Sequence, residues 1–98
     1  MSCNRLELSG EIVTLEVLRH TPAGIPVLAF TVKHASIQND AGMKRQAECE
    51  VPVMAMAELA KKAAGLKIGD KVKVAGFLAR KSLRNDRLVL HLDELETE

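Results

Sequence analysis

The chain has 98 residues, of which 47% are hydrophobic and 28% are charged, and its formal net charge is +1. This size and composition are typical of one globular domain, which we expect to span residues 1–98. The N-terminus lacks the apolar stretch of a secretory signal, and no apolar run approaches the roughly 20 residues that cross a bilayer. We therefore expect a cytoplasmic protein with no membrane partner.

The first predicted strand covers about residues 4–19 and changes phase in its middle. The residues expected on its inner face before and after the change are Leu6, Leu8, Ile12, Val13, Leu15 and Val17. Gly10 stands just before the change, and a glycine beside a phase slip indicates a bulge or a sharp bend. Such a bend lets one strand contribute to two sides of a small barrel.

Two further strands follow a turn that is rich in proline and glycine, at residues 20–26. The alternation of apolar and polar residues predicts a second strand over residues 27–34, a polar loop at 38–42 and a third strand over 44–53. The side chains of the third strand that are expected inside are Ala47, Cys49, Val51 and Val53. Those expected outside are Lys44, Gln46, Glu48 and Glu50.

One helix is predicted, over residues 54–64, followed by two more strands over residues 71–78 and 87–95. The buried stripe of the helix is expected to consist of Met56, Leu59, Ala60 and Ala63. Gly76 is expected to bend the fourth strand, whose outer face carries Lys71, Lys73 and Phe77. A polar loop at 82–86 precedes the last strand, and its expected inner residues are Leu88, Leu90 and Leu92.

The order of these elements is strand, strand, strand, helix, strand, strand. Five short strands with a helix between the third and the fourth are typical of the OB fold, in which a curved sheet closes on itself and the helix covers one end. The sequence therefore predicts an all-β protein, a five-stranded OB-fold barrel with one short helix.

Motifs for catalysis or metal binding do not stand out in the sequence. The three histidines belong to different predicted elements, and neither they nor the cysteines Cys3 and Cys49 have the spacing of metal ligands. No glycine-rich phosphate loop is present. We therefore expect reduced thiols, no cofactor, no metal and a binding protein rather than an enzyme.

The basic residues suit a nucleic-acid ligand. An OB barrel binds single strands across its second and third strands, between the loops that join strands one to two and four to five. The candidate DNA-binding residues near these places are Arg19, Lys33, Lys44, Lys81, Arg84 and Arg87. Stacking platforms are scarce, since the chain has two Phe, no Trp and no Tyr, so we expect modest affinity driven by phosphate contacts.

Several stretches in the right order resemble the family of primosomal replication protein N, or PriB. They are residues 4–10, 21–26, 42–49, 72–77 and 88–91, of which TPAGIP and RQAEC are the most specific. The resemblance implies an OB-fold homodimer that binds single-stranded DNA and stimulates the PriA helicase in the restart of stalled replication forks. It also implies DnaT as a further partner in some members. By position, it places DNA contacts at Arg19, Lys44, Arg84 and Arg87.

Two positions depart from the pattern of that family. Glu48 and Met43 stand where the family can hold aromatic residues, and Glu48 and Glu50 together oppose a polyanion on the expected binding strand. A second hypothesis therefore stays open. In it, the barrel is a protein-interaction module that acts mainly through PriA and binds DNA weakly.

Overall fold

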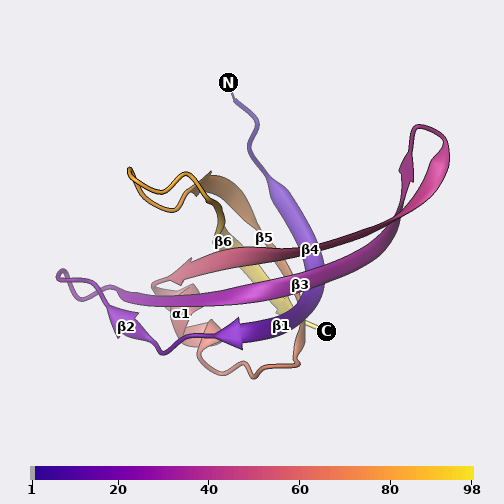
Figure 1. The fold of residues 1–98 in the computed structure, drawn as a ribbon. Helices are drawn as coiled ribbons and strands as arrows, with labels where there is room; N and C mark the ends of the chain where they lie inside the picture. Colours follow the sequence, from indigo (N-terminus) through magenta and orange to yellow (C-terminus); the bar gives the residue numbers. More distant parts are fainter. Residues whose placement is uncertain (1) are drawn as a thin grey trace.

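Six strands and one short helix make up the computed structural model, which describes residues 2–98. The elements are β1 (Leu6–Leu15), β2 (Arg19–His20), β3 (Pro26–Asp40), β4 (Met43–Met56), α1 (Glu58–Ala63), β5 (Lys71–Arg80) and β6 (Leu88–Thr97). β1 pairs with β5 and with β3, and β6 pairs with β5 and with β4, so the five long strands close into a barrel (Figure 1). The predicted OB fold is confirmed, and the two-residue β2 is an addition at the edge of β3.

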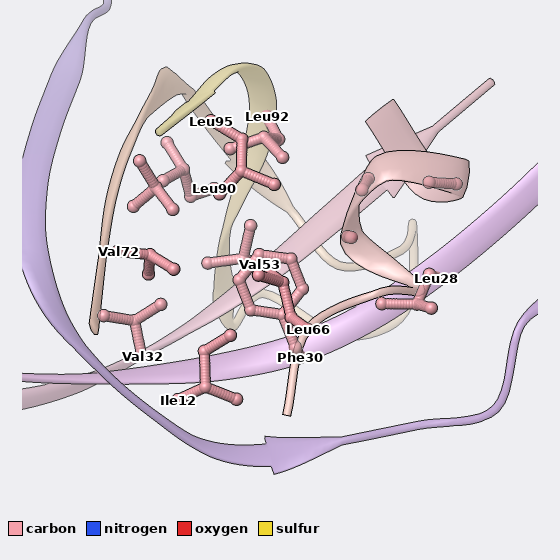
Figure 2. Packing of buried hydrophobic residues seen from close by; sticks show 14 residues of the cluster. Ile12, Leu28, Phe30, Val32, Val53, Leu66, Val72, Leu90, Leu92 and Leu95 are labelled. Atoms are coloured by element: carbon pink, nitrogen blue, oxygen red, sulfur yellow. The ribbon is translucent and has the colours of Figure 1, made fainter. Parts of the chain in front are cut away.

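The core is built from the inner faces of all five long strands, as Figure 2 shows. Phe30 and Val32 both point inward from β3, with Thr31 between them pointing outward. They pack with Ile12 of β1 and Leu90 of β6 in the middle of the barrel. Full burial of such a side chain contributes about 1.5–3 kcal/mol, so this cluster supplies most of the drive to fold. From the helix, Ala60 and Ala63 reach the same cluster, and their small size lets α1 pack closely against the strands.

Two glycines let the sheet close. Gly10 lies in β1 where that strand leaves β5 for β3, and a Cβ atom there would lie 2.3 Å from the carbonyl oxygen of Lys33. Gly76 lies at a register shift in β5, and its Cβ would lie 1.8 Å from the carbonyl oxygen of His91. The predicted irregularities in both strands are confirmed, since β1 also shifts register between Ile12 and Thr14.

The hairpin of β3 and β4 is longer than the sequence predicted. The strands pair from Val27 with Met56 out to Asp40 with Met43, and only the turn residues Ala41 and Gly42 separate them. Both turn residues have positive φ, 54° and 84°, as a tight two-residue hairpin turn requires. The predicted loop at 38–42 is therefore wrong. In Figure 1 this hairpin curves away from the barrel, and its residues 37–46 are all exposed.

Some predicted inward positions are exposed. The affected residues are Val17, Cys49, Met56 and Leu88. Cys49 lies on the projecting part of β4, where no core exists for it to fill. The helix begins at Glu58 rather than at residue 54, because β4 continues to Met56 and Ala57, with φ of 57°, interrupts the backbone.

The described part of the chain, residues 2–98, has α1 as its one helix, and α1 has six residues. No helix there is long and apolar enough to cross a membrane.

Replacing Gly76 by Ala should destabilise the protein by roughly 2–3 kcal/mol, because its Cβ would meet the backbone of β6, which cannot move without breaking the sheet. Gly65→Ala is the matched control, since its Cβ would have an ordinary contact of 3.6 Å. Urea unfolding of both variants measures the difference. Equal stabilities would contradict the role assigned to Gly76.

Candidate nucleic-acid interface

A hollow of about 210 Å³ lies on the outside of the barrel, over β3 and β4. We call it the barrel groove. Its floor consists of the outward residues Ala29, Thr31, Pro52 and Met54, and its walls include Glu16, Arg19, Lys81, Arg87 and His91. The β5–β6 loop and the turn after β2 both lie at the end of the barrel opposite the hairpin tip, as Figure 1 shows. The groove is therefore in the place that the OB fold predicts.

Strand alternation explains the floor. Thr31 stands between the buried residues Phe30 and Val32, and it is the register partner of Pro52 on β4. Ala29 is likewise the partner of Met54. These outward side chains carry no charge, so the floor can accept apolar or uncharged groups while charge is confined to the walls.

Three of the six predicted DNA-binding residues meet at the barrel groove. Arg19 comes from β2, and Lys81 and Arg87 stand at the two ends of the β5–β6 loop, where the Lys81 amide donates to the Arg87 carbonyl at 2.9 Å. All three side chains are exposed. Within residues 2–98 none of them forms an ion pair, so their charges are available to an anion. Glu16 is the acidic residue on the same walls.

The other three predicted residues lie outside the groove. Arg84 is on the β5–β6 loop, where its backbone amide donates to Ser82 Oγ at 3.3 Å. Lys33 lines a second hollow, together with Lys71 and Glu98. Lys44 pairs with Asn39 near the tip of the β3–β4 hairpin, at the far end of the molecule. The sequence suggested that the six residues converge on one surface. In the structure they do not.

The acidic pair on the expected binding strand also lies outside the groove. Glu50 and Glu48 pair with Lys33 and Ala35, further along the hairpin than Pro52 and Met54. The predicted parity of the strand, with even-numbered residues outward, holds for the groove floor. The predicted strand ended at residue 53, so Met54 lay outside it, whereas β4 continues to Met56. Pro52 lay within the predicted strand, but no role was assigned to it.

The groove borders an aromatic pair that sequence reasoning did not find. His91 lines the groove, and its ring stacks on that of Phe77, with centroids 5.1 Å apart and planes inclined by 8°. Phe77 is 45% exposed. The available signal was the outward position of both residues on neighbouring strands, but their pairing depends on the register of β5 and β6.

Asp93, Glu94 and Glu96, the acidic residues near the C-terminus, lie on β6. Asp93 and Glu94 contact Arg5 at 3.2 and 3.3 Å, and Glu7 lies 3.7 Å from the same guanidinium. Asp93, followed by Glu94 and Glu7, raises the pKa of Arg5 above its ordinary value. These contacts partly neutralise the acidic charge on this side of the sheet. Among residues 2–98, no three His, Cys, Asp or Glu side chains come together as metal ligands.

Comparisons with known proteins agree with this geometry. Residues 4–94 match a family described as another single-strand binding protein family. The chain is 37% identical to replication restart protein PriB of Proteus mirabilis, over 98% of this chain and 94% of that protein. It resembles the solved structure of PriB from Ralstonia solanacearum, with a TM-score of 0.89, 31% identity and 98% of each chain covered. The small single-stranded DNA-binding protein of Streptomyces coelicolor shares the fold, with a TM-score of 0.77, 22% identity and coverage of 100% and 96%.

Proposed function

The chain belongs to the single-strand binding protein family that includes replication restart protein PriB, and we propose that it binds single-stranded DNA in the barrel groove and stimulates the PriA helicase. In this proposal the protein is an accessory factor of replication restart and catalyses no reaction. The observation that carries the proposal is the meeting of Arg19, Lys81 and Arg87 around an uncharged floor.

This arrangement suits the two parts of a nucleotide chain. Phosphates need cations, which the groove walls supply from β2 and from the β5–β6 loop, and bases need an uncharged surface, which the floor supplies. For single-stranded nucleic acid, each phosphate that the protein neutralises adds about −0.7 to the slope of log K against log salt concentration. Three contacts therefore predict a slope of roughly −2.

The groove also predicts a binder of modest strength. Glu16 stands on its walls and opposes phosphate, while the floor residues Thr31, Pro52 and Met54 offer no aromatic ring. Binding is then expected to depend little on base sequence, because stacking and phosphate contacts read no base edges.

The protein partners in the proposal rest on the family resemblance. PriA, a second copy of the chain and, in some members, DnaT are the partners that it implies. One structural observation favours the alternative of a module that acts mainly through PriA. The projecting hairpin carries the exposed Ile37 on the same face as Glu48 and Glu50, and the exposed Met43 next to its turn on the opposite face, which suits a protein surface better than a polyanion.

Charge reversal at Arg87 should weaken single-strand binding by roughly tenfold, because it removes a charge-assisted phosphate contact and adds repulsion. The matched control is Lys44→Glu on the hairpin, which should change affinity little. Fluorescence anisotropy with labelled dT oligomers at several salt concentrations measures both. A salt-independent affinity of the wild type would contradict phosphate binding altogether, and a larger effect at Lys44 would place the strand on the hairpin.

Glu16→Gln should strengthen binding to the same oligomers by roughly twofold, because it removes the one acidic charge on the groove walls. Glu48→Gln makes the same chemical change on the hairpin and should leave the affinity unchanged. If Glu48→Gln strengthened binding and Glu16→Gln did not, the DNA would follow the hairpin instead of the groove.

Stimulation of PriA separates the two hypotheses. With purified PriA and a forked DNA substrate, Arg87→Glu should reduce unwinding in step with its loss of DNA affinity. A combined Ile37→Ser and Met43→Ser variant, with both changes at exposed sites, should keep its DNA affinity. Loss of stimulation in that variant alone would favour the alternative, in which the hairpin contacts PriA.

A further inference from the structure

We propose that the ring pair of Phe77 and His91 is a base-stacking site that continues the barrel groove across β6 onto β5. The proposal rests on single-strand binding in the groove and adds the place where an unpaired base leaving the groove would stack. The ligand is thus one nucleobase of a strand whose phosphates are held by the groove walls.

The sheet register joins the ring pair to the groove. Ala29 of β3 pairs with Met54 of β4, Met54 pairs with His91 of β6, and His91 pairs with Phe77 of β5. These four residues therefore form one row across four neighbouring strands, which lie about 4.8 Å apart. Because His91 belongs both to the groove lining and to the ring pair, the two surfaces are continuous.

The geometry of the pair suits a third planar ring. The two rings are nearly parallel, at 8°, and each uses one face on the other at 5.1 Å between centroids. A base can extend such a column by the same offset stacking. Phe77 keeps 45% of its surface exposed, although a phenylalanine is usually buried, and exposed aromatic rings are the surfaces on which unpaired bases stack.

The charges around the pair favour a nucleotide and set a limit to its path. At the loop end of β5 and β6 lie Lys81 and Arg87, which have no acidic partner within residues 2–98. Toward the other end of these strands lie Asp93 and Glu94 of β6 and Glu7 of β1, gathered around Arg5. A nucleotide on the rings is therefore favoured on the side of the β5–β6 loop, and the carboxylates oppose a path along β6 away from that loop.

The first experiment uses the absence of Trp and Tyr from the chain. In Phe77→Trp the new indole is the sole strong emitter, and a base stacked on it quenches its fluorescence. Titration with unlabelled dT oligomers should lower the emission along the same curve that anisotropy gives for binding. Ile68→Trp is the control, since Ile68 is 67% exposed in the segment between α1 and β5, away from the groove, and its emission should stay constant.

The second experiment measures affinity. Phe77→Ala and Phe77→Leu should both bind labelled dT about fivefold more weakly than wild type, the lower end of the effect of losing a stacked aromatic. Full affinity in Phe77→Leu would overturn the proposal, because apolar contact alone would then suffice. The tryptophan variant keeps the ring, so it tests the site even where the alanine variant folds poorly.

The outcomes separate this site from the function on which it rests. If the wild type binds dT but the emission of Phe77→Trp stays constant, the stacking site is overturned and groove binding stands. Wild type that does not bind dT overturns both. Emission that changes with protein concentration in the absence of DNA means that a second copy covers the rings, and it also overturns the stacking site.

Discussion

The close approach of backbones at two glycines is the constraint on which the rest of this structure depends. At Gly10 the chain passes from one sheet neighbour to another against the carbonyl of Lys33, and at Gly76 it bends against the carbonyl of His91. A side chain at either point would hold the strands apart. Closure in turn brings β3, β4 and β6 side by side, and that arrangement puts cations from β2 and from the β5–β6 loop around one uncharged floor.

The barrel itself was predictable because its signals are local. Alternating apolar residues, glycines at the bends and a short Ala-rich helix are visible in the sequence without any knowledge of pairing. The projecting hairpin was not, because alternation reports burial, and between Ala35 and Glu50 there is little burial to report. Its polar tip reads as a loop, although two residues with positive φ, Ala41 and Gly42, suffice for the turn.

Three of the six predicted DNA-binding residues line the barrel groove, and the other three lie outside it. Charge and fold family pointed to the loops that hold Arg19, Lys81 and Arg87. The floor depends on where β4 ends, since the predicted strand stopped at Val53 and left out Met54, whereas β4 continues to Met56. The stacking of Phe77 on His91 depends on a register that the bulge at Gly76 shifts, and sequence patterns do not carry that information.

The contact between β4 and β6 has a thermodynamic consequence. Within residues 2–98 this parallel seam consists of two residue pairs, Val53 with Leu90 and Met54 with His91, whereas every other junction between long strands is longer. It is therefore the place where the barrel can open at the least cost in hydrogen bonds. A strand lying over Met54 and His91 would bridge both sides of the seam. Occupancy of the groove and closure of the barrel are then linked equilibria, each of which favours the other.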